Sequence, residues 1–368
     1  MNKEANLLFI LLRAGLWEKE PEELSLFPLP PETWAGIFRL SRMHTVTGIV
    51  YRGILRLPDD CLPPWEMLAQ WVAQAERIER MNRTMNEVLA ELYALFDSKG
   101  WLAVLQKGQG VARFYEEPLL RECGDIDLYF PDRRAQNEAA EWLRKEGCHP
   151  EKAPDGSLHY HYKGIVVEHH PELIDLQNPF LHGYLSRLIA GEGFGKAVLA
   201  EGRVTAVVPS PLLELLLLNT HIMKHAIGRG VGLRQLCDIA RAYHSLHGQF
   251  DPETLRFLYI KTGISHWSSL LHAFLVDYIG LSSDRLPYDE HRLLSSQPLL
   301  DIVLRGGNFG QHADGQEKAR AQSGWIRKLH TARSFCRNLH FAATYASGES
   351  FWTAARLLRG QFRNNLHG

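Results

Sequence analysis

The sequence predicts an α+β fold in which a small mixed sheet lies between two helical regions. Apolar residues recur three and four positions apart before residue 98 and again after residue 209, which is the spacing of amphipathic helices. Between these regions, short apolar and alternating runs typical of strands are interspersed with short helical patterns. We therefore expect a helical region over residues 1–98, an α+β domain over residues 99–208 and a second helical region over residues 209–368.

The composition argues against several classes of protein. The 368 residues carry 41 Lys and Arg against 42 Asp and Glu, whereas a protein whose whole surface binds nucleic acid is usually strongly basic. The five cysteines are far apart and form no C-x-x-C pair, which argues against a disulfide scaffold or a cysteine zinc site. The longest apolar runs are too short to span a membrane, and the N-terminus lacks the pattern of a signal peptide. We expect a soluble, cytoplasmic protein with no membrane partner.

The N-terminal region is predicted to contain helices separated by proline clusters, since proline interrupts helical hydrogen bonding. The helical patterns cover residues 5–16, 31–55 and 64–99. In the last of them, Trp71, Ala75, Ile78 and Asn82 lie along one stripe, so we expect that face of the helix to be buried.

The middle region changes character at Gly100. Residues 159–162 and 165–169 are rich in residues that favour strands and are separated by Lys163 and Gly164, which predicts a hairpin. Asp132 is a suitable N-cap for a helix that Gly147 would end. The remaining predicted elements are strands at residues 101–106, 125–130 and 203–208 and helices at residues 110–116 and 132–146.

Helical patterns resume after Pro209 and Pro211. The clearest segments are residues 212–227, 232–246, 252–262 and 266–279. Residues 306–315, GGNFGQHADG, form the most loop-like stretch, which is either a linker or a substrate loop. Helical patterning then continues to Arg363.

The pair Asp125 and Asp127 is the strongest chemical signal. Alternate strand residues share a face, so the two carboxylates would lie side by side, where like charges repel. A divalent cation would offset this cost, and Mg²⁺ prefers carboxylate oxygen together with substrate phosphates. Glu168, which ends an apolar run 41 residues beyond Asp127, is a suitable third acid if its strand lies beside the first. Two such ions would clamp the attacking and leaving oxygens of an in-line displacement.

The residues around this pair are suited to an anionic ligand. Gly108, Gln109 and Gly110 form a turn between a predicted strand and a predicted helix, where glycine lets the backbone approach phosphate. Lys107 and Arg121 would neutralise triphosphate charge. Taken separately, each motif has an ordinary structural interpretation, a solvated edge strand for D-x-D and a simple turn for K-G-x-G.

Histidines are the second chemical signal. His221 and His225 lie four residues apart, so they would share one helix face. That spacing allows three interpretations: polar residues on a packed helix, contacts to substrate, or ligands of a zinc hydrolase. The segment between them lacks the glutamate of H-E-x-x-H, which argues against zinc hydrolysis. Arg234 and Asp238 are likewise four apart, and a simple ion pair within a helix accounts for them.

Together these motifs resemble the uncharacterised bacterial nucleotidyltransferase family of the DNA polymerase beta-like nucleotidyltransferase superfamily. The resemblance covers roughly residues 85–245. The residues that carry it are Lys107-Gly108, Tyr115, Pro118, Arg121, Gly124-Asp125-Ile126-Asp127-Leu128, Val167-Glu168-His169, His221, Lys224-His225 and the run from Leu233 and Arg234 to Ala240. The resemblance implies a nucleotidyltransferase-type mixed sheet with helices.

The resemblance also implies an activity: metal-dependent transfer of a nucleoside monophosphate from an NTP to an acceptor hydroxyl, with release of pyrophosphate. Asp125, Asp127 and Glu168 would be the catalytic acids and would bind Mg²⁺ or Mn²⁺. The nucleotide-binding residues would be Lys107, Gly108, Gln109, Gly110, Arg121 and Gly124. The candidate substrate contacts are His169, His221, Lys224, His225 and Arg234. Many superfamily members have Ser at the position of Gln109.

The acceptor is not identified by any motif. We expect a small molecule or a protein side chain rather than a long nucleic acid, because the net charge of −1 provides no general basic surface. The alternative function is a non-catalytic module that uses the same cleft to hold a nucleotide or a partner.

Overall fold

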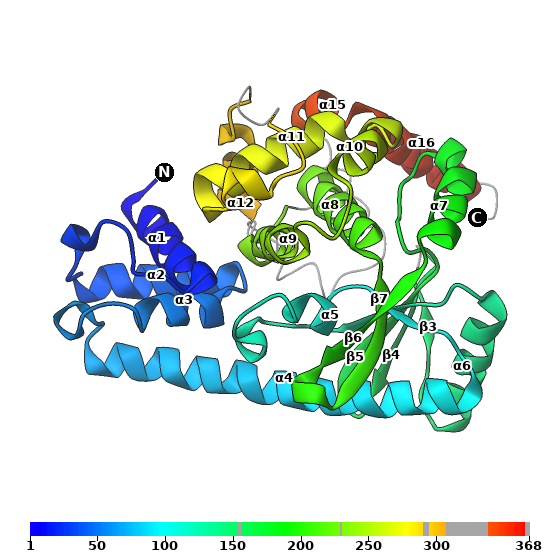
Figure 1. The fold of residues 1–368 in the computed structure, drawn as a ribbon, viewed down its shortest axis with the longest axis horizontal. Coiled ribbons are helices and arrows are strands. Elements are labelled where there is room, and N and C mark those ends of the chain that lie inside the picture. The colour runs from blue at the N-terminus through cyan, green and yellow to red at the C-terminus, as the bar shows by residue number, and fades with distance from the viewer. Residues whose placement is uncertain (154–155, 229, 290–293, 307–337, 365–368) are drawn as a thin grey trace. The chain divides into compact units, whose positions relative to one another are not determined.

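The computed structural model describes residues 1–153, 156–228, 230–289, 294–306 and 338–364 (Figure 1). Beyond Gly306, the loop expected at residues 306–315 lies outside these ranges. The chain divides into two compact units. The first contains Met1–Leu173 and Gly193–Glu214, and the second contains Ile174–Glu192 and Leu215–Gly368. The α+β fold class predicted from the sequence is confirmed.

The first unit begins with four helices: α1 (Lys3–Trp17), α2 (Pro31–Met43), α3 (Thr47–Ile54) and α4 (Trp65–Lys99). Asn2 caps α1, because its Oδ1 accepts the Ala5 N–H at 2.9 Å. Helices α1 and α3 cross where glycines allow their backbones to touch, since a Cβ at Gly53 would collide with the carbonyl oxygen of Leu11. The predicted segment at residues 31–55 is divided into α2 and α3 by a turn in which Thr45 has a φ of 53°.

A seven-stranded mixed sheet forms the centre of this unit. Its order is β3-β4-β5-β2-β1-β7-β6, with β2 parallel to β5 and β1 parallel to β7. The predicted hairpin is confirmed, because β4 and β5 are antiparallel and joined by Lys163 and Gly164, both with positive φ. The strands are β1 (Val104–Leu105), β2 (Ile126–Tyr129), β3 (Glu151–Lys152), β4 (Leu158–Tyr162), β5 (Ile165–His170), β6 (Phe194–Leu199) and β7 (Val204–Pro209).

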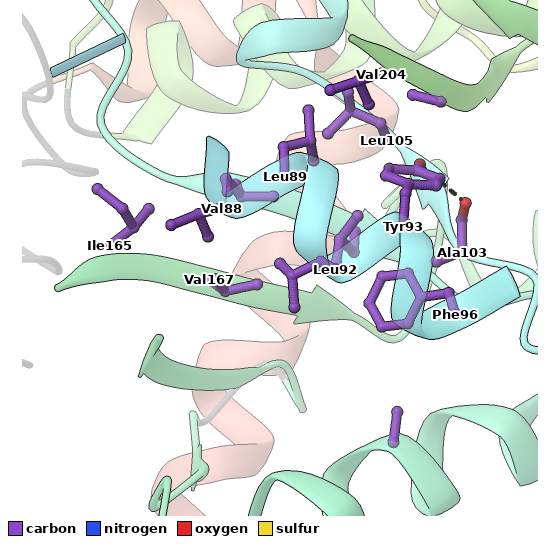
Figure 2. Close-up of a cluster of buried hydrophobic side chains, with 14 of the residues drawn as sticks. Val88, Leu89, Leu92, Tyr93, Phe96, Ala103, Leu105, Ile165, Val167 and Val204 are labelled. Atoms are coloured by element: carbon purple, nitrogen blue, oxygen red, sulfur yellow. Dashed lines mark hydrogen bonds between the residues drawn. The ribbon is translucent and has the colours of Figure 1, made fainter. Parts of the chain in front are cut away.

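The sheet packs on the C-terminal half of α4 (Figure 2). The Tyr93 hydroxyl donates to the carbonyl oxygen of Ala103 at 3.0 Å and so joins the helix to the chain entering β1. The helix contributes Met85, Val88, Leu89, Leu92, Tyr93 and Phe96 to the buried cluster. Burying each large apolar side chain contributes roughly 1.5–3 kcal/mol, so α4 supplies much of the stability of the sheet.

Shorter elements complete the first unit. Helix α5 (Gln109–Ala112) is a single turn and ends earlier than the predicted helix at residues 110–116. Helix α6 (Arg133–Lys145) begins as expected, with Asp132 Oδ1 accepting the Arg134 N–H at 2.9 Å. Single 3-10 turns lie at Leu24–Leu26, Asp59–Cys61, Pro118–Leu120 and Ala200–Gly202.

The second unit is helical in its described part. A buried amide ties two of its helices together, because Asn219 Oδ1 accepts the Trp267 indole N–H at 2.8 Å and its Nδ2 donates to Ser268 at 3.1 Å. Its described helices are α7 (His182–Glu192), α8 (Pro211–Gly228, which begins in the first unit), α9 (Leu233–Leu246), α10 (Pro252–Lys261), α11 (Ser265–Phe274, followed by a π-helical turn at Leu275–Ile279), α12 (Gln297–Gly306), α15 (Leu339–Tyr345) and α16 (Ser347–Asn364), with 3-10 turns at Pro179–Leu181 and Ser283–Arg285. Among the described helices, none has the length and apolarity needed to cross a membrane.

This division differs from the three regions expected over residues 1–98, 99–208 and 209–368. The N-terminal helices and the sheet belong to one compact unit, because α4 supplies part of the core of the sheet. The segment Ile174–Glu192, which includes α7, belongs to the second unit although it lies between two strands of the first.

Candidate functional site

Two parallel strands bring the candidate acids together. Strands β2 and β5 are direct neighbours, and Asp127 lies opposite Glu168 in their register. The neighbouring residues of Asp127, Ile126 and Leu128, are buried in the core on the opposite face. Alternation in β5 places His170 on the same face as Glu168. The sequence predicts that the strand of Glu168 lies beside the strand of the aspartates, and the pairing of β5 with β2 confirms this arrangement.

Asp127, Glu168 and His170 form a compact group of candidate metal ligands. Each offers one ligand atom, and these atoms all lie within 4.8 Å of one another. His170 Nε2 is 2.6 Å from Asp127 Oδ1 and 3.5 Å from Glu168 Oε2. Asp127 is 3% exposed, whereas Glu168 and His170 are half-buried. A buried carboxylate next to a second acid is stable only beside positive charge.

Lys107 supplies positive charge at the same place. Its Nζ lies 3.0 Å from Asp127 Oδ1. Burial by itself would lower the Lys107 pKa, but the charges of Asp127, Asp125 and Glu168 outweigh it and raise the pKa. Burial likewise acts to raise the Asp127 pKa, whereas Lys107 and His170 hold it well below its usual range. The site therefore holds an ionised Asp127 carboxylate beside a charged lysine at neutral pH.

Asp125 lies immediately before β2 and is half-buried. It is close enough for its charge to act on Lys107, but the compact ligand group contains His170 in its place. The backbone at Gly108 lies close to the backbone of Asp125, because a Cβ at Gly108 would be 3.1 Å from the Asp125 carbonyl oxygen. Gly108 has a φ of 56°, so glycine serves both the turn and this close approach. Gly110 is buried in α5 against Leu105.

The Gln109 and Arg121 side chains are both buried. Gln109 is 5% exposed, and its amide donates to Asn82 Oδ1 at 3.1 Å. Asn82 in turn donates to the carbonyl oxygens of Leu119 and Arg121 at 2.6 and 2.9 Å. These bonds join α4, the glycine turn and the segment that leads to Asp125. The Gln109 amide therefore supports the turn, and nucleotide binding by Gln109 stays a prediction.

Arg121 is 4% exposed, and its Nη1 contacts Cys123 Sγ at 2.8 Å and the Glu122 carbonyl oxygen at 3.3 Å. These contacts engage the guanidinium with its own chain segment, and a phosphate contact by Arg121 stays a prediction. Gly124, by contrast, is exposed, and a Cβ there would meet no described atom within 4 Å.

The His169 side chain lies in the core of the first unit, on the face of β5 opposite Glu168. It is fully buried, packs on Phe130 with ring centroids 4.7 Å apart, and its Nε2 lies 2.8 Å from the Tyr160 hydroxyl. Burial, together with the neighbouring His170, lowers the His169 pKa to about 3. In the sequence, His169 is a candidate because it follows Glu168. The alternation of strand residues instead predicts that His170, and not His169, lies on the same face as Glu168.

The other candidate substrate contacts belong to the second unit. On α8, Lys224 forms an ion pair with Asp175, and the Nε2 atoms of His221 and His225 lie 3.2 Å apart. Arg234 is half-buried near the start of α9. In the described part of the chain, the group of at least three candidate metal ligands is Asp127, Glu168 and His170, and the zinc interpretation of the histidine pair therefore gains no support.

The ligand group fits a divalent cation. Carboxylate oxygens are the donors that Mg²⁺ prefers, and an imidazole beside two carboxylates also suits Mn²⁺. The two acids lie on adjacent rigid strands, so little ordering is needed for them to bind an ion together.

A protein family and a solved structure are similar to this chain. The crystal structure of an antigenic nucleotidyltransferase-like protein from Paracoccidioides brasiliensis is similar at 13% identity and a TM-score of 0.33, over 53% of this chain and 92% of that chain. No curated protein matches the sequence. The sequence profile of the family described as "Uncharacterised nucleotidyltransferase" matches residues 30–276, which include all seven strands and the candidate site. The chain therefore belongs to the uncharacterised nucleotidyltransferase family.

Proposed function

We propose that this protein is a metal-dependent nucleotidyltransferase that transfers a nucleoside monophosphate from an NTP to an acceptor hydroxyl and releases pyrophosphate. The observation that carries the proposal is the pairing of Asp127 with Glu168 on adjacent parallel strands, in a chain of the nucleotidyltransferase family. Two acids held side by side on rigid strands, one of them buried, are typical of sites that bind a cation.

Asp127, Glu168 and His170 would hold Mg²⁺ or Mn²⁺, and Asp125 would complete the acidic site. The bound cation would neutralise the charge that develops on the transferring phosphoryl group. Glu168 is the less buried of the two paired acids, with a side chain 19% exposed, and it is suited to accept the proton of the acceptor hydroxyl.

The glycine turn and Lys107 would bind the triphosphate. Gly108 and Gly110 would shape the turn that presents backbone N–H groups, and exposed Gly124 has no side chain to obstruct the approach of phosphate oxygens. Lys107 already lies in contact with Asp127 and is long enough to exchange a carboxylate for a phosphate oxygen. On the second unit, His221, Lys224, His225 and Arg234 remain our candidates for contacts to the nucleotide or acceptor.

We infer that the reaction takes place in the cytoplasm and that the acceptor is a small molecule or a protein side chain.

The transfer reaction is tested by measuring pyrophosphate release from each of the four NTPs with Mg²⁺ and a panel of hydroxyl acceptors. We expect Asp127→Asn and Glu168→Gln each to reduce turnover at least a hundredfold, because each removes a charge that the cation needs. Glu66→Gln, at an exposed position in the first turn of α4, is the control and should retain activity.

Unchanged NTP consumption in the folded double variant Asp125→Asn and Asp127→Asn would overturn the catalytic assignment. Calorimetric titration with NTP, with and without Mg²⁺, separates the alternative function. Binding without pyrophosphate release across the acceptor panel would identify a non-catalytic nucleotide-binding module.

A further inference from the structure

A histidine on β4 contacts the proposed third acid from the side opposite His170. Strands β4 and β5 are antiparallel, and His159 lies directly across from Glu168 in their register. His159 Nδ1 is 2.9 Å from Glu168 Oε1. The other oxygen of the same carboxylate, Oε2, faces His170 Nε2 at 3.5 Å. The two oxygens of Glu168 therefore have different partners, one on each side.

The ring of His159 is itself held at its far edge. Ser157 Oγ lies 2.7 Å from His159 Nε2, and Ser157 is fully buried. An ionised carboxylate only accepts hydrogen bonds, so Nδ1–H donates to Glu168. In the neutral imidazole, Nε2 then accepts the hydroxyl proton of Ser157. This chain of two hydrogen bonds sets both the tautomer and the orientation of the ring.

We propose that His159, oriented by Ser157, is a positioning residue that fixes the Glu168 carboxylate for binding a divalent cation. The inference rests on the proposed function, which makes Glu168 a metal ligand. Carboxylates that bind metals are generally held by hydrogen bonds from a second layer of residues, and loss of such a residue typically weakens metal binding 10–100-fold. His159 supplies this bond from a neighbouring strand, so the rigid hairpin transmits the orientation.

A serine, a histidine and an acid joined in this order by hydrogen bonds also form the active site of many nucleophilic hydrolases. In such a site the serine hydroxyl must reach a substrate carbonyl. Ser157 is fully buried, whereas the His159 side chain is 37% exposed, so the hydroxyl is the inaccessible end of the chain of hydrogen bonds. The geometry thus favours positioning of the acid over attack by the serine.

The test is Mn²⁺ binding to the full chain, followed by electron paramagnetic resonance, with the metal alone as the probe. We expect His159→Ala to weaken Mn²⁺ binding about tenfold. His159→Asn should restore most of the affinity, because its amide nitrogen lies as many bonds from Cα as Nδ1 does. His159→Gln, whose amide corresponds to Nε2, should behave like the alanine variant. The matched control is His161→Ala, two residues along the same strand, which should bind like wild type.

The outcomes separate this proposal from the one on which it rests. A wild-type chain that binds no Mn²⁺ would overturn the proposed metal site itself. Wild-type binding with unchanged affinity in His159→Ala would overturn only the role of His159, as would an equal loss in His161→Ala. If His159→Ala does not fold, Ser157→Ala replaces it, with an expected loss of a few-fold, and unchanged affinity in that variant contradicts the proposal. Circular dichroism establishes folding in each case.

Discussion

Two adjacent histidines show how one residue of register decides which surroundings a side chain meets. His169 faces the core and bonds Tyr160, whereas His170 faces Asp127 and Glu168. The backbone of β5 produces this difference, because consecutive side chains in a strand point to opposite faces. The same alternation places Asp127 between two buried apolar neighbours and still leaves its carboxylate beside Lys107.

Replacing His169 with alanine should mainly affect stability, whereas replacing His170 should mainly affect Mn²⁺ affinity. We expect His169→Ala to lower the free energy of unfolding by about 2–4 kcal/mol, because it leaves a cavity and an unpaired Tyr160 hydroxyl. His170→Ala should cost less stability than His169→Ala, because Lys107 still pairs with Asp127, but it should weaken Mn²⁺ binding. Urea unfolding and Mn²⁺ titration of both variants measure the two effects. Greater destabilisation in His170→Ala than in His169→Ala would contradict these assignments.

At the scale of elements, α16 is attached to the second unit by a buried acid. Glu349 is 6% exposed, and its Oε1 accepts the Gln177 N–H at 2.7 Å. Burial raises the Glu349 pKa to about 7, and nearby Asp175 acts in the same direction, while Lys224 and the backbone bond oppose it. The contact therefore holds a carboxyl group that prefers to stay protonated near neutral pH.

This contact makes stability depend on pH. Between the ordinary pKa of 4.5 and about 7, the unfolded chain releases the Glu349 proton while the folded chain keeps it. The free energy of unfolding must therefore fall as pH rises through this window, and level off above it. Glu349→Gln keeps an acceptor for Gln177 but carries no charge. We expect it to be more stable than wild type at pH 8, by up to about 3 kcal/mol, and equally stable near pH 4.5.

Thermal unfolding of both proteins between pH 4.5 and 8 measures this difference. The melting temperature of the variant should exceed that of wild type by a margin that grows with pH. Glu253→Gln, an exposed acid on α10, is the control and should follow wild type. A margin that shrinks as pH rises would contradict the raised pKa.

At the scale of the whole chain, the predicted domain boundary at residue 98 falls between a helix and the sheet that it stabilises. The six apolar residues of α4 in the core of the sheet contribute on the order of 10 kcal/mol, as much as the whole stability of a typical domain. The buried bonds from Asn82 to the segment at residues 119–121 add a polar connection between α4 and the chain leading to the acids.

A fragment of residues 99–208 should therefore not fold alone, although it contains all the candidate acids. We expect no cooperative thermal transition by circular dichroism and few dispersed amide signals by NMR. A fragment of residues 64–214, which restores α4 and β7 in full, should recover both. A cooperative transition in the shorter fragment would show that α4 is dispensable.

Local patterns were enough to predict much of the fold and part of the site. Periodicity identified the helices and the hairpin, and the turn residues Lys163 and Gly164 have the positive φ values that such a turn needs. The short strands β3 and β6 were missed, because β3 has two exposed residues and β6 contains a glycine and an exposed lysine within its apolar pattern. Pairing with a neighbouring strand, not local pattern, makes these segments strands.

The sequence by itself determined which chemistry is available: Asp127 and Glu168 on strands, Asp125 just before the first of them, and Lys107 beside a glycine turn. Only the tertiary structure decided which polar side chains face that chemistry. Gln109 and Arg121 are turned inward, while His159 and His170 approach Glu168 from two sides. The physical reason is that periodicity encodes the face of each residue on its own element, whereas strand pairing and burial between distant segments select its partners.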